Sequence, residues 1–207
     1  MEERSIASTI RFLLFLNVIA AAVFLGGEFL GVKTELLFDP SADLPNFIAL
    51  VQSEEFMIWT ARGLVGICLE ILGALGIYLA LLKSRYSLVA LAALASTAIG
   101  DVAGSAMFGT LYSILPALGE YASTVDQGVI AATQPTALIP ILNLTFTVIG
   151  LSLFAFAIWR SAVLPRYSGL IVLVGFLLIP FPSAIIQVVA NLLWLAGSVW
   201  MFVGFNK

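Results

Sequence analysis

The sequence is organised around residues 61–80, which read ARGLVGICLEILGALGIYLA. This apolar stretch carries an acid, Glu70, near its middle and a basic residue, Arg62, at its start. When the stretch is wound into an α-helix, its small and polar residues fall on one side and Leu, Ile and Val on the other. A bare carboxylate in hydrocarbon is costly, so we expect Glu70 to face protein or water and to need a partner.

The composition identifies the class of protein. The chain has 207 residues, of which 61% are hydrophobic and 10% are charged, and its mean hydropathy is +1.11. A soluble domain carries about 25% charged residues, so the chain is expected to be an integral membrane protein whose main partner is the lipid bilayer. The net charge of -3 argues against a nucleic-acid partner.

Two residue counts restrict the chemistry. The sequence has no histidine and a single cysteine, Cys68. A histidine-ligated haem, an ordinary zinc site and a Ser-His-Asp triad are therefore excluded, and a disulfide within the chain is impossible. We expect no cofactor, no metal and no catalytic residues. An intramembrane enzyme that uses an Asp/Glu acid–base pair is the one enzymatic alternative left open.

The pattern of apolar runs predicts an all-α fold, a single membrane-spanning bundle over residues 1–207. Each run is judged against the roughly 20 residues that a crossing needs. The six candidate spans are about 9–31, 57–82, 86–115, 136–160, 166–180 and 183–205. The first could be a cleaved signal peptide, but we interpret it as an anchor helix. The fifth is short and ends at Pro180-Phe181-Pro182, so one long broken segment over 166–205 is the alternative.

The distribution of charge predicts the topology. Basic residues lie at three predicted inner positions: Arg4 and Arg11, Lys83 and Arg85, Arg160 and Arg166. The opposite loops are acidic, with Glu35, Asp39, Asp43, Glu54, Glu55, Glu120 and Asp126. The positive-inside rule then places both termini in the cytoplasm and requires an even number of crossings, which favours six transmembrane helices.

Two loops on the acidic side are long enough to hold structure. In residues 41–54, Asp43 can cap a helix that has Pro45 in its first turn. Phe47, Leu50 and Val51 recur at helical spacing, so we expect a short helix lying on the membrane surface, with an irregular loop as the alternative. Residues 116–135 are weakly amphipathic, and either loop could cover an outward-facing cavity.

Polar residues inside the predicted spans fall into layers when about 1.5 Å is counted for each residue from the inner boundary. Glu70, Asp101 and Asn191 share one layer. Four others lie closer to the outer side, namely Glu28, Asn143, Gln187 and Arg62. Two carboxyl groups at one depth with a single arginine nearby cannot both ionise cheaply, so one of them is expected to carry a proton.

These polar residues allow two interpretations. In the structural one, small residues let helix backbones approach, polar side chains bond between helices, and Arg62 pairs with Glu28 or Asp101. In the functional one, Glu70 and Asp101 line a wet cavity and bind a proton, a cation or a polar ligand, since intramembrane acids commonly mark such sites.

Two stretches resemble a known group of proteins. One is the hairpin Ile158–Leu170, IWRSAVLPRYSGL, and the other runs from Leu69-Glu70-Ile71-Leu72-Gly73 to Leu82-Lys83-Ser84. Over about 61–175 the chain resembles uncharacterised six-helix membrane proteins of bacteria, a domain-of-unknown-function family. The resemblance implies a multi-pass protein of the bacterial inner membrane, and it implies no activity. The architecture is also similar to that of the substrate-binding subunits of vitamin-uptake transporters, although none of their motifs is matched.

The leading hypothesis is a membrane protein for solute or ion binding, or for proton-coupled transport. In it Glu70 and Asp101 form the proton or cation site, and Arg62 and Glu28 form an outer gate or ligand clamp. Hydrogen bonds to a ligand would come from Asn143, Gln187 and Asn191. A homodimer is expected, because six spans are few for a solitary transporter. The alternative is a non-catalytic accessory subunit of a larger membrane complex, whose small-residue faces on spans one and three contact other chains.

Overall fold

The computed structural model describes residues 2–32, 35–38, 43–121, 138–181 and 183–205, and their regular structure is entirely helical. Five helices are long and apolar enough to cross a membrane. They are α1 (Glu2–Gly27), α4 (Glu54–Leu81), α5 (Ser87–Ser113), α8 (Leu138–Ser161) and α10 (Ala184–Gly204). The all-α prediction is therefore confirmed, and the chain is a multi-pass membrane protein.

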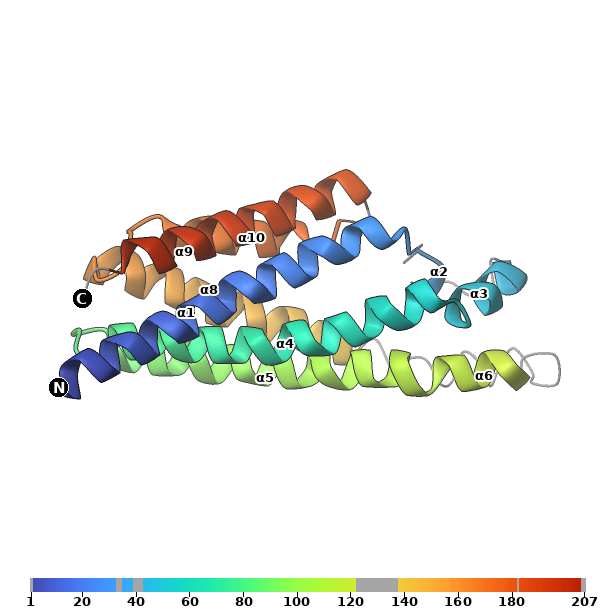
Figure 1. Cartoon of the computed structure of the whole chain (residues 1–207), viewed down its shortest axis with the longest axis horizontal. Coiled ribbons are helices and arrows are strands. Elements are labelled where there is room, and N and C mark those ends of the chain that lie inside the picture. The colour runs from blue at the N-terminus through green and yellow to red at the C-terminus, as the bar shows by residue number, and fades with distance from the viewer. Residues whose placement is uncertain (1, 33–34, 39–42, 122–137, 182, 206–207) are drawn as a thin grey trace.

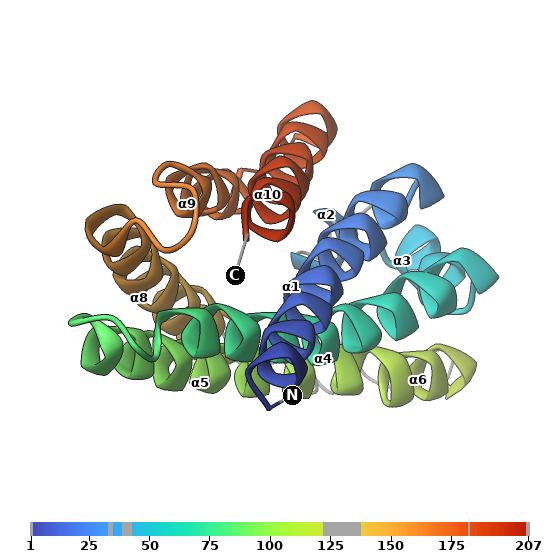
Figure 2. The same ribbon diagram turned by 60° about the vertical axis from the view of Figure 1, so that its left-hand side comes forward.

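The fifth predicted span forms a much shorter helix. α9 (Ser168–Leu178) has 11 residues, about 17 Å at 1.5 Å for each residue, against a hydrocarbon core of about 30 Å. It packs beside α10 in both views (Figures 1 and 2). Residues 166–205 are therefore a hairpin of two helices and not one interrupted helix. Gln187 holds the turn, because its Nε2 donates to the Ile179 carbonyl and, at 3.0 Å, to the Phe181 carbonyl.

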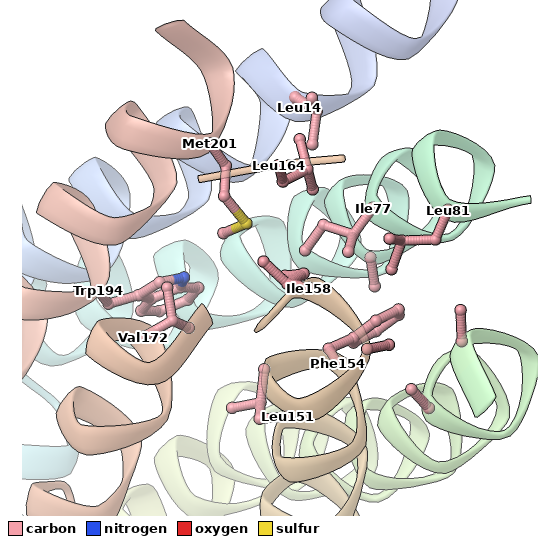
Figure 3. Packing of buried hydrophobic residues seen from close by; sticks show 14 of the residues in the cluster. Leu14, Ile77, Leu81, Leu151, Phe154, Ile158, Leu164, Val172, Trp194 and Met201 are labelled. Atoms are coloured by element: carbon pink, nitrogen blue, oxygen red, sulfur yellow. The ribbon is translucent and has the colours of Figure 1, made fainter. Parts of the chain in front are cut away.

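The helices form a closed ring in chain order. α1 packs on α4, α4 on α5, α5 on α8, α8 on α9 and α9 on α10, and α10 returns to α1. Figure 2 shows this circuit. The side chains that fill it come from most of its members: Leu14, Ile77, Phe154, Trp194 and Met201 point into a common apolar core (Figure 3).

The two ends of the bundle differ in charge and in structure. The first turn of α1, the last turn of α10, the α4–α5 turn and the α8–α9 turn all lie at one end (Figure 1). This end therefore gathers the basic residues Arg11, Lys83, Arg85, Arg160 and Arg166. The short helices α2 (Glu35–Phe38), α3 (Leu44–Val51) and α6 (Leu115–Tyr121) lie at the other end.

The short helix predicted in residues 41–54 is present as α3. Asp43 caps it by accepting from the Asn46 backbone N–H at 3.3 Å, and a proline occupies its first turn. Its apolar face packs on protein, however, because Phe47 and Val51 are buried in a second cluster with Phe56 of α4. The position of this helix at the membrane surface stays a prediction. α6 begins the second outer segment, and residues 122–137 lie outside the described residues.

α5 and α8 make a close backbone approach through a motif that occurs on both helices. Thr97-Ala-Ile-Gly100 on α5 faces Thr147-Val-Ile-Gly150 on α8, and the helices run antiparallel (Figure 1). A methyl group added at Gly100 would lie 2.8 Å from the Thr147 backbone nitrogen, and one at Gly150 would lie 2.7 Å from the Thr97 nitrogen. Both glycines are therefore required by the crossing itself.

We predict that Gly100→Ala destabilises the bundle by about 1–3 kcal/mol, because backbone atoms of α8 cannot move away from the new methyl group. The matched control is Gly109→Ala on the same helix, where no atom lies within 4 Å of the added carbon. This control should be neutral or up to about 1 kcal/mol more stable, because alanine favours helix over glycine. Thermal unfolding in detergent measures both, and equal midpoints for the two variants would contradict the prediction.

Candidate functional site

Two acids occupy the middle of the bundle without a cation. Glu70 on α4 is 6% exposed and Asp101 on α5 is 1% exposed, and the two carboxyl groups are near enough to interact electrostatically. Neither accepts a hydrogen bond from a described residue, and Asp101 Oδ2 is fully buried without a partner. Within the described part of the chain, no basic side chain forms an ion pair with either acid. Both acids are thus buried and interact electrostatically, and that they form one site stays a prediction.

A small cavity adjoins Glu70. Its volume is about 20 Å³, enough for a water molecule, which needs roughly 10–15 Å³. Its polar lining comes from Asn17, Glu70 and Thr97, on α1, α4 and α5. Its apolar walls are Ala74, Ile77, Leu151, Phe154, Val172 and Trp194, most of which are labelled in Figure 3. All six helices of the ring line the cavity, and its size suits a proton, a water or a small ion better than an organic solute.

Two buried threonine hydroxyls at the α5–α8 crossing also lack hydrogen-bond partners among the described residues. Thr60 and Thr110 follow the usual pattern for a helix, in which the hydroxyl donates to the carbonyl one turn earlier, at 3.0 and 2.9 Å. Thr97 and Thr147 do not, and both of their oxygens are buried without a hydrogen bond. The sequence analysis did not include these two residues in the site. The matched Thr-x-x-Gly motifs on α5 and α8 were the signal that could have found them.

The guanidinium of Arg62 binds the C-terminal end of α1. It donates to the Val23 carbonyl at 3.2 Å and to the Phe24 carbonyl, and Phe24 is one of the last four residues of α1, whose carbonyl groups have no partner within an α-helix. The guanidinium also lies 5.5 Å from the centroids of the Phe24 and Trp59 rings. A cation is favoured at a helix C-terminus, where the backbone dipole is negative. Arg62 therefore caps α1 from α4, a role that the sequence analysis did not predict.

Glu28 and Asn191 complete an outer polar cluster with Arg62. Glu28 begins the 3₁₀ turn η1 (Glu28–Leu30) and interacts electrostatically with Arg62. Asn191 on α10 donates to Glu28 Oε1 at 3.3 Å and to the Gln187 carbonyl at 3.0 Å. Asn191, predicted to share a layer with Glu70, thus bonds to the outer acid. Of the two pairings predicted for Arg62, the structure places Glu28 beside it and not Asp101.

Aromatic rings lie between the outer cluster and the cavity. The Phe24 ring, which contacts Arg62, packs on Trp194 with 5.2 Å between centroids. Trp194 in turn lines the cavity and contacts Phe176 of α9 at 4.7 Å. The outer acid and the inner acids are therefore separated by apolar side chains.

The remaining two predicted site residues bond to backbone. Asn143 on α8 donates to the Gly100 carbonyl of α5 at 2.8 Å, and Gln187 holds the α9–α10 turn. Both contacts match the structural interpretation, in which polar side chains bond between helices. In the described residues no group of three or more His, Cys, Asp or Glu is arranged to hold a metal ion.

We predict that Arg62→Lys lowers the stability of the protein by about 1.5–3 kcal/mol, the range for hydrogen bonds to a charged donor. Lysine keeps the charge but lacks the planar fork that reaches two carbonyls and stacks on two rings. Arg166→Lys is the control, since Arg166 is exposed and has no partner among the described residues. Thermal unfolding measures both changes, and an unchanged midpoint for Arg62→Lys would show that the cap is not needed.

Comparison with known proteins gives no relative: no family model, curated protein or solved structure matches this chain. The resemblance to uncharacterised six-helix bacterial membrane proteins therefore stays a prediction. The function is inferred from the geometry of this chain alone.

Proposed function

We propose that the chain binds and releases a proton at the Glu70–Asp101 pair, as the central site of proton-coupled transport across the inner membrane. One observation carries this proposal: two interacting carboxyl groups are buried at the centre of a membrane bundle with no basic partner among the described residues, and one of them lines a cavity. Asn17, Thr97 and Thr147 are proposed as the polar groups that surround the exchanged proton.

Burying two carboxylates without a cation is unfavourable in free energy. A carboxylate without a counter-charge loses several kcal/mol of hydration free energy when buried, and a second carboxylate beside it adds repulsion. The inexpensive states of the pair hold at least one proton or a small cation. Arg62 does not neutralise the pair, because its guanidinium is held at the end of α1, where Nη1 donates to the Val23 and Phe24 carbonyls. A site that must be neutralised from outside suits the exchange of a proton.

The proposed topology has six crossings with both termini in the cytoplasm. It is supported by the gathering of basic residues at one end of the bundle, because positive loops face the cytoplasm. α9 would be the fifth crossing element along the chain and the shortest, completed by the turn at Pro180. Since Val172 of α9 lines the cavity, a movement of this short helix would open or close access to Glu70, as interrupted helices do in transporters.

The alternative of an accessory subunit is less well supported. It predicts that the small-residue faces of the first and third spans contact other chains. Instead, Gly100 and Gly104 pack against α8, and Gly27 packs against Arg62. Gly26, Gly31 and Gly109 are the positions on these elements that have open space beside them.

Infrared difference titration in lipid tests the proposal. The wild type should show the C=O band of a protonated carboxyl at neutral pH that disappears as the pH is raised. Glu70→Gln and Asp101→Asn should each change that band, by loss or by a shift in its frequency and titration, because each deletes one member of the pair while keeping its shape.

Glu54→Gln provides the control, since Glu54 is exposed at the start of α4 and its loss should leave the band unchanged. If the wild type shows only ionised carboxylates at neutral pH while both variants fold, the proton-binding proposal is refuted.

A further inference from the structure

Two arginines converge on one tyrosine at the basic end of the bundle. Tyr86 caps the start of α5, and its ring packs edge-on against Phe156 of α8 with 5.8 Å between centroids. Arg160, in the last turn of α8, donates from Nε to the Tyr86 hydroxyl at 3.3 Å. The guanidinium of Arg85 lies 4.9 Å from the Tyr86 ring centroid. The two guanidinium groups are thereby held on opposite parts of one side chain.

The charges of this cluster are not balanced by the protein. Both arginines are exposed, and in the described part of the chain no carboxylate pairs with either of them. The positive charges of the two arginines act on Tyr86 itself. The pKa of Tyr86 is lowered, first by the hydrogen bond from Arg160 and then by the positive charges of Arg160 and Arg85. Because one Nε–H of Arg160 is used on Tyr86, its terminal N–H groups are left to bind an external acceptor.

The surroundings of the cluster are those of a lipid interface. Trp159 is 45% exposed and follows Phe156 closely on α8, and an indole at the end of a spanning helix is typical of the membrane–water boundary. An apolar surface begins directly beside the charges, because Leu88 is 80% exposed and Phe156 is 46% exposed. A ligand that satisfied both features would be anionic at one end and apolar at the other.

We propose that Arg85, Arg160 and Tyr86 bind the phosphate of an anionic phospholipid, whose acyl chains lie along Leu88 and Phe156. The guanidinium fork matches phosphate oxygens in two simultaneous hydrogen bonds. Free phosphate would use the charges but not the adjacent apolar surface, so the observations favour a lipid headgroup. The site lies at the opposite end of α5 from the outer cluster and does not depend on the proposed role of Glu70.

Native mass spectrometry of the purified full chain, titrated with phosphatidylglycerol or phosphatidylcholine, tests this inference. Phosphatidylglycerol should bind more tightly than phosphatidylcholine. Arg85→Gln and Arg160→Gln should each weaken phosphatidylglycerol binding about fivefold, the contribution of one arginine near an anionic surface. Tyr86→Phe should weaken it as well, since Arg160 loses the hydroxyl that positions it. Arg166→Gln, at the same end but without contact to Tyr86, should change the affinity less than about twofold.

Three outcomes would overturn the proposal. Equal affinity for the two lipids would show that the headgroup charge is not recognised. An equal loss in Arg166→Gln would show a diffuse surface potential and not a site. Displacement of phosphatidylglycerol by an equal concentration of inorganic phosphate would identify a free-anion site. The variants change exposed arginines and the half-buried Tyr86, and thermal unfolding midpoints close to the wild type confirm that each variant is folded.

Discussion

Two buried acids without a counter-cation are the constraint on which the rest of the structure depends. Glu70 and Asp101 lie at the centre of a ring of helices, and every member of that ring contributes to the small cavity next to Glu70. A protein that needed these acids only for stability would place a cation beside them, because an uncompensated charge in hydrocarbon costs several kcal/mol. The nearest arginine along the sequence, Arg62, is held at the end of α1 instead.

The packing around the acids keeps this arrangement in place. The matched Thr-x-x-Gly motifs bring the backbones of α5 and α8 together next to Asp101. On the other side of the cavity, Asn17 donates to Ser198 at 3.0 Å and joins α1 to α10. The layer of Phe24 and Trp194 then separates the inner acids from Glu28. Long helices thus surround the site on most sides, and α9 is the one short helix of the ring.

Much of the fold followed from the apolar runs, whereas the partners of the polar residues did not. Periodicity and length placed the five long helices and the capped helix α3, because burial in lipid requires continuous apolar stretches. Periodicity and length could not show that α3 packs on protein, because this packing depends on tertiary contacts with Phe56. Counting residues from the inner boundary placed Glu70 and Asp101 at one depth, but this count does not show which face of a helix meets which neighbour. It therefore missed that Arg62 caps α1, that Asn191 bonds to Glu28, and that Thr97 lines the cavity with Glu70.

The stability of neutral variants tests the central claim most directly. Thermal unfolding in lipid nanodiscs would compare the wild type with Glu70→Gln and Asp101→Asn at neutral pH. If the acids are kept for function at a cost in stability, each neutral isostere should be as stable as the wild type or more stable. A loss of about 3–5 kcal/mol, the cost of breaking a compensated buried ion pair, would contradict the account. Such a result would mean that Glu70 and Asp101 hold the bundle together.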